Sequence, residues 1–77
     1  ILIAMFWEDH NPPPFHARYG EHRAAIEIGT LRILDGTLPP QALGLVVDWA
    51  SQHKDELMAN GDAARAGRPL RKIEPLP

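Results

Sequence analysis

Cysteine is absent from the 77 residues, so the chain forms no disulfide and offers no thiolate ligand to a metal. Positive charge is not in excess, because eight lysines and arginines stand against ten acidic residues. The formal net charge of -2 excludes a broadly cationic nucleic-acid binder. The longest apolar run, residues 1–7, is far below the roughly 20 residues that cross a bilayer. We therefore expect a single small cytoplasmic domain over residues 1–77, without a membrane segment.

Strand-like segments fill the first half of the chain. The bulky apolar residues 1–7 indicate a strand that is either central in the sheet or covered on both faces. Its abrupt start predicts that an upstream piece precedes it. Residues 15–19 and 22–28 indicate a hairpin around Gly20 and Glu21, with glycine first in the two-residue loop, as a type II′ turn requires. Residues 31–34 are expected to form a short further strand, which Asp35-Gly36 ends.

The hydrophobic pattern selects one register for this hairpin. Directly opposed residues share a face of the sheet, so one face becomes apolar and the other polar and basic. A slip of one residue would bury Arg18, which disfavours the alternative register. The predicted opposed pairs are Phe15–Ile26, His16–Ala25, Ala17–Ala24, Arg18–Arg23 and Tyr19–His22.

The second half of the chain is helical in pattern. Thr37 is a candidate cap for a helix running from about 40 to about 59, with Pro39-Pro40 in its first turn. Asn60-Gly61 is typical of a helix end, after which a short helical turn is expected at about 62–66. The fold class is therefore α+β: a small antiparallel sheet of three to four strands packed against one long helix, with a short C-terminal helical turn.

One candidate site is the polar segment that follows the first strand. Glu8, Asp9, His10 and His16 bring two carboxylates and two imidazoles close together in sequence, as a site for a divalent metal would need. The alternative is a solvated loop, since this spacing matches no established metal motif. The same residues would suit a hydrolytic nuclease that uses a histidine as its base.

A second candidate is the basic face of the hairpin, formed by His16, Arg18 and Arg23, with Arg32 as a further candidate member. Two arginines directly opposed across a ladder repel each other, and an anionic partner between them would offset that repulsion. The alternative is that Glu21 and Glu27 neutralise the face through ordinary surface salt bridges. A weaker basic cluster lies in the tail, where helix-end complementarity is a sufficient explanation; its members are Arg65, Arg68, Arg71 and Lys72.

Motifs spread over most of the chain resemble a small bacterial family catalogued as domain of unknown function 4160. The family signature maps onto His10, Pro12, Pro13, Phe15 and His16. The resemblance continues through 34–39, 47–50, 64–70 and 73–76. The chain departs from the family at two positions, with Pro14 where a further histidine is usual and Gly61 where an aromatic residue is usual.

The resemblance implies short prokaryotic proteins without an assigned activity, often encoded beside another small domain. That arrangement is similar to toxin–antitoxin pairs, and it implies a partner protein from a neighbouring gene or a nucleic acid. We therefore expect a homodimeric, non-enzymatic binding module without a cofactor, whose contact residues are His10, His16, Arg18 and Arg23. The alternative function is a metal-dependent nuclease or hydrolase built on Glu8, Asp9, His10 and His16.

Overall fold

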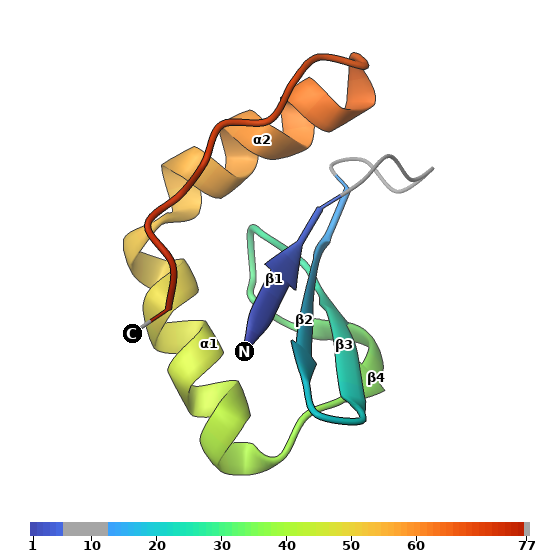
Figure 1. The fold of residues 1–77 in the computed structure, drawn as a ribbon, viewed down its shortest axis with the longest axis vertical. Coiled ribbons are helices and arrows are strands. Elements are labelled where there is room, and N and C mark those ends of the chain that lie inside the picture. The colour runs from blue at the N-terminus through green and yellow to red at the C-terminus, as the bar shows by residue number, and fades with distance from the viewer. Residues whose placement is uncertain (6–12, 77) are drawn as a thin grey trace.

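The computed structural model describes residues 1–5 and 13–76, and it has four strands followed by two helices (Figure 1). The strands form one antiparallel sheet in the order β1-β2-β3-β4. This confirms the α+β class. The elements are β1 (Leu2–Ala4), β2 (Phe15–Tyr19), β3 (His22–Ile26), β4 (Ile33–Thr37), α1 (Pro40–Gln52) and α2 (Lys54–Arg65).

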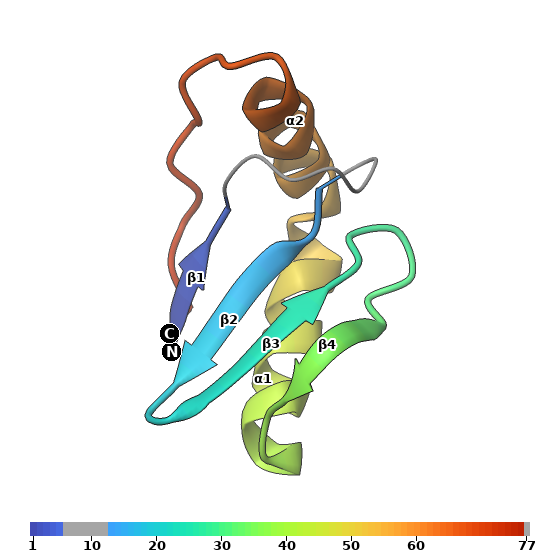
Figure 2. The same ribbon diagram turned by 90° about the vertical axis from the view of Figure 1, so that its right-hand side faces the viewer.

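The molecule has two layers, because both helices lie on the same face of the sheet (Figure 1). Figure 2 looks onto the other face, which neither of the two described helices covers. Alternation along β2 and β3 explains this arrangement, since their large apolar side chains, Phe15 and Ile26, lie on the side of the helices and are buried there. The core joins residues of the strands, of the loops after β3 and β4, and of the two helices. Its members are Phe15, Ala17, Ala24, Ile26, Ile28, Leu38, Val46, Trp49, Ala50 and Leu57.

The first strand lies at an edge of the sheet and is covered on one face only. Ile3 packs against the core, whereas Leu2 is 67% exposed and Ala4 is exposed. The expectation of a strand that is central or covered on both faces is therefore wrong for the described residues. The helices lie on one face of the sheet only, so an apolar run does not by itself place a strand in the centre.

The fourth strand begins and ends later than the sequence predicted. It runs over Ile33–Thr37, so Asp35 and Gly36 lie inside it and Thr37 is a strand residue rather than a helix cap. Gly36 makes this pairing feasible: its φ is +80°, and a Cβ built there would lie 2.1 Å from the Arg23 carbonyl oxygen. The helix instead begins after Pro39, with no side chain capping it.

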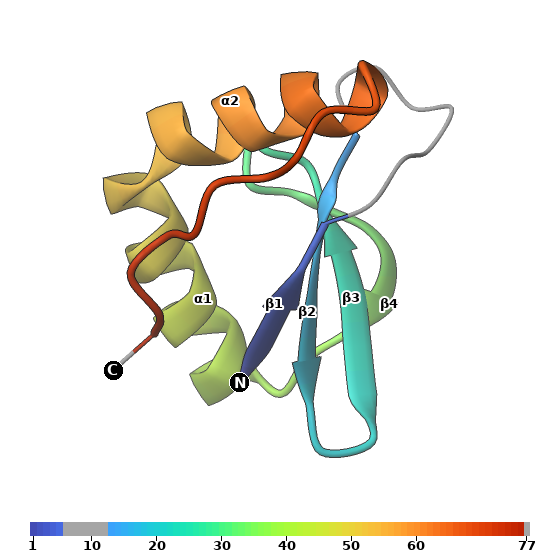
Figure 3. The same ribbon diagram turned by 45° about the horizontal axis from the view of Figure 1, so that its top comes forward.

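The helical region divides at His53, which corrects the prediction of one long helix with a short turn after it. The His53 amide donates to the Ala50 carbonyl at 3.1 Å, and the chain changes direction there (Figure 3). A straight helix over 40–65 would be about 39 Å long. It would overrun a five-residue strand of roughly 17 Å. The bend returns Leu57 to the core, where it is 1% exposed.

The expected helix end at Asn60 and Gly61 is instead the buried interior of α2. A Cβ at Gly61 would lie 3.4 Å from Ile28 Cδ1 and 3.8 Å from Pro13, so an aromatic side chain there would displace both neighbours. Neither helix in the described part of the chain is long and apolar enough to cross a membrane.

Beyond α2, residues 67–76 form an extended tail that returns along the helices (Figure 1). Ile73 and Leu76 of this tail pack against the core. The Trp49 indole Nε1 donates to the Glu74 carbonyl at 2.8 Å. The tail is therefore part of the folded domain.

Candidate binding surface

The hairpin places Arg18 and Arg23 directly opposite each other. All five predicted pairs of β2 and β3 are present, and Gly20 has a φ of +58° in the loop that joins the strands. Glu21 keeps a negative φ, as the second loop residue of a type II′ turn requires. Both arginines are exposed, and because they alternate with the buried Ala17 and Ala24 they belong to the face that the helices leave uncovered. Figure 2 looks onto that face of the sheet. The predicted juxtaposition of the two side chains is thus confirmed.

Neither arginine meets a carboxylate within ion-pair distance among the described residues. The ion pair that joins two described residues is His53 with Glu56, whose Nδ1 and Oε1 atoms lie 2.7 Å apart. Arg18 Nε donates to the Gly20 carbonyl at 3.4 Å, a long contact within its own turn. The salt bridges to Glu21 and Glu27 that would neutralise the face are absent from this part of the structure. Glu27 instead accepts a hydrogen bond from Thr30.

The neighbouring strands extend this surface on both sides, and we call it the open sheet face. One row across the sheet reads Leu2, Arg18, Arg23 and Thr37. The next row reads Ala4, His16, Ala25 and Asp35. The charged side chains in these two rows are Arg18, Arg23 and Asp35, and the other side chains apart from Leu2 and His16 are small.

His16 lies in the second row and is half-buried. Its opposed partners, Ala4 and Ala25, have small side chains. His16 shares a face with the arginines because it is two residues before Arg18 on the same strand. The predicted contact residues His16, Arg18 and Arg23 are thus brought together on one surface, whereas the fourth, His10, lies outside the described residues.

The predicted metal candidates do not come together within the described part of the chain. Glu8, Asp9 and His10 lie outside it, and His16 alone is described. Within residues 1–5 and 13–76, no group of three histidine or acidic side chains could hold a metal ion. The nuclease or hydrolase alternative stays a prediction, because three of its four residues are outside the described ranges.

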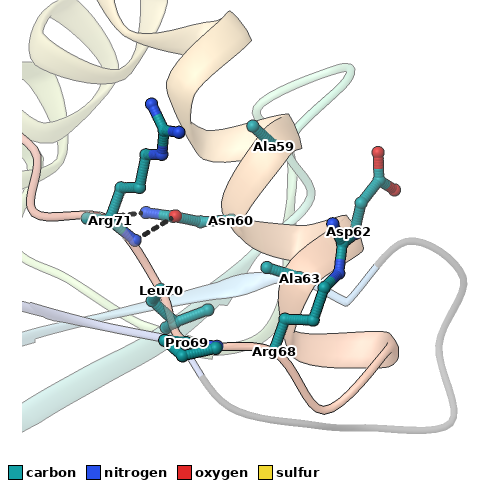
Figure 4. Close-up of a pocket in the computed structure, with 8 residues that line it drawn as sticks. All are labelled: Ala59, Asn60, Asp62, Ala63, Arg68, Pro69, Leu70 and Arg71. Atoms are coloured by element: carbon teal, nitrogen blue, oxygen red, sulfur yellow. Dashed lines mark hydrogen bonds between the residues drawn. The ribbon is translucent and has the colours of Figure 1, made fainter.

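Sequence reasoning missed the role of Asn60, which lines an open hollow of about 640 Å³ between α2 and the tail (Figure 4). Its Nδ2 donates to the Arg71 carbonyl, and its Oδ1 accepts the Arg71 amide, both at 2.8 Å. Both the nitrogen and the oxygen of the side-chain amide are therefore bound to the tail main chain. Asn60 serves to dock the tail, and the pattern that resembled a helix end concealed this role.

The basic tail residues lie beside the helices and away from the open sheet face. Arg68 and Arg71 line the hollow at α2 (Figure 4). Lys72 is the next residue of the tail. The tail cluster and the arginine pair are consequently separate surfaces. This separation makes the tail cations suitable controls for charge changes on the sheet.

The fold and this surface together define a class of protein: a small α+β domain with one sheet face covered by helices and the other open and basic. The model of the family described as a domain of unknown function, DUF4160, matches residues 1–60. The chain belongs to this family, as the resemblance in the sequence predicted. Neither a curated protein nor a solved structure matches the chain.

Proposed function

We propose that this chain is a non-enzymatic binding module and one component of a two-gene toxin–antitoxin-like or regulatory system. Its partner is an acidic protein or a nucleic acid, held on the open sheet face. The observation that carries the proposal is the exposed pair Arg18 and Arg23, directly opposed and without a carboxylate partner among the described residues. His16 lies on the same face and contributes to the contact.

The energetics of the arginine pair support an anionic partner. Cβ atoms of directly opposed residues lie about 4.5–5.5 Å apart, and like charges at that distance destabilise a sheet. An anion seated between the guanidinium groups would turn this repulsion into attraction. Arginine is suited to this role because its planar fork binds a carboxylate or a phosphate through two parallel hydrogen bonds.

The test is co-expression of the chain with the product of the gene beside its own, followed by affinity purification. We expect the two proteins to purify together and the Arg18→Glu, Arg23→Glu double variant to lose the partner. The double variant keeps a like-charged pair in the same place, so its stability should stay close to that of the unchanged chain. Circular dichroism and the melting temperature check this point.

The matched control is the Arg68→Glu, Lys72→Glu variant, which makes the same change in net charge in the exposed tail. It should retain the partner. Partner recovery that is equal for the two double variants would refute the assignment of the open sheet face. Nuclease treatment before elution shows whether nucleic acid joins the two proteins.

A further inference from the structure

We infer that the open sheet face binds an acidic amphipathic polypeptide segment and not a nucleic acid. This inference rests on the proposed function and narrows it to one class of partner. Three features of the described residues support it: an apolar side chain beside the arginines, the lack of an aromatic platform, and the small number of cations on the face.

The apolar feature is Leu2, which lies directly opposite Arg18 on the edge strand and is 67% exposed. Ala4 and Ala25 occupy the next row of the same face. A partner can therefore place an apolar side chain on Leu2 and Ala4 while its carboxylates reach Arg18 and Arg23. A segment with acidic and apolar residues on one side matches this arrangement, whereas a phosphate backbone gains nothing from Leu2.

The second feature is the lack of a stacking platform on the described part of the face. Proteins that bind single strands stack bases on exposed aromatic rings. Here Phe15 and Trp49 are buried in the core. Tyr19 is half-exposed, but it alternates with Arg18 and so belongs to the opposite face at the hairpin tip.

The third feature is the charge. Affinity for nucleic acid comes mainly from several cations that neutralise successive phosphates. The two rows of the open sheet face present two arginines, together with Asp35. Arg32 directly precedes β4, Arg65 belongs to α2, and Arg68 and Arg71 line the hollow beside that helix. Two guanidinium groups suffice to pair with two carboxylates of a polypeptide but not to follow a polyanion.

The experiment measures fluorescence anisotropy with three labelled probes and the full chain. The first probe is a helical peptide of leucine and glutamate in which a stripe of leucines is flanked by glutamates on the same face. The second has the same composition in scrambled order, and the third is a single-stranded oligouridine. We expect the first probe to bind most tightly, since it alone combines carboxylates with a continuous apolar stripe.

Two variants assign the binding to the face. Arg18→Glu with Arg23→Glu should lower the affinity for the first probe by about tenfold or more. Arg68→Glu with Lys72→Glu should leave that affinity nearly unchanged. Leu2→Ser should lower the affinity for the first probe several-fold without altering the salt dependence of binding, because the lost contact is apolar. Leu2 is mostly exposed, so this change should not unfold the domain.

Tighter binding of the oligouridine, lost in the arginine double variant, would overturn the polypeptide assignment and leave the proposed function standing. An unchanged affinity of Leu2→Ser would overturn the amphipathic part. Failure of the first probe to bind would overturn the inference as a whole. The proposed function would still be judged separately, by whether its neighbouring-gene partner depends on the two arginines.

Discussion

At the scale of single residues, the position of Arg23 depends on a glycine in the adjacent strand. Gly36 lies opposite Ala24 with a φ of +80°, and a Cβ there would meet the Arg23 carbonyl oxygen at 2.1 Å. Hydrogen is therefore the only side chain that lets β4 approach β3 at this point. The backbone conformation that Gly36 adopts therefore allows β4 to pair with β3 beside Arg23, and this pairing extends the open sheet face.

We expect Gly36→Ala to lower the free energy of unfolding by about 1–3 kcal/mol, because it combines a strained φ with a backbone collision. Urea denaturation measures this change. The control is Gly44→Ala in α1, where the space around a Cβ is open. A helical glycine replaced by alanine should raise the stability by about 0.5–1 kcal/mol. Equal midpoints for Gly36→Ala and the unchanged chain would contradict the account of Gly36.

At the scale of elements, the tail is held to the helices by two side-chain contacts with its main chain. Asn60 makes both of its hydrogen bonds to Arg71, and Trp49 donates to Glu74. Asn60 is 7% exposed, so its amide needs these partners to remain buried at low cost. The tail thereby closes the side of the core where Ile73 and Leu76 pack.

Asn60→Ala should release the tail around Arg71 and cost about 1–3 kcal/mol of stability, since it leaves the Arg71 main-chain groups unpaired. Limited trypsin digestion measures the release as faster cleavage after Arg71 and Lys72. Gln52→Ala is the control, because it removes an exposed amide at the end of α1. An unchanged cleavage rate in Asn60→Ala would show that the tail is held without this residue.

At the scale of the whole molecule, size and topology support the prediction of a homodimer. A chain of this length buries only roughly 60% of the surface that it exposes when unfolded. The edge strand β1 pairs with β2 on one side, and among the described strands it has no partner on the other. Unpaired strand edges favour pairing with a second chain. A dimer formed there would leave Arg18 and Arg23 accessible.

We expect light scattering at micromolar concentration to give about twice the chain mass of 8.6 kDa. Ala4→Lys adds a charge to the edge strand at an exposed position and should increase the fraction of monomer. A monomeric mass for the unchanged chain would remove the dimer proposal. The arginine-pair proposal would remain, because it depends on the hairpin alone.

The sequence by itself determined the hairpin and its register. Alternation of apolar and polar residues and a two-residue loop beginning with Gly20 are local signals, and they act on residues that are neighbours in the chain. The opposition of Arg18 and Arg23 follows from them without any distant contact. The family was also evident from motifs spread along the sequence, as the match over residues 1–60 confirms.

Only the tertiary structure decided the division of the helix at His53, the extension of β4 through Gly36 and the docking of the tail on Asn60. Each of these depends on contacts between residues far apart in the chain. The helices bend to stay over a short sheet, and Asn60 finds its partner eleven residues later in Arg71. Local patterns suggested turns at Asp35-Gly36 and Asn60-Gly61, but packing against β3, Ile28 and the tail outweighed those weak preferences.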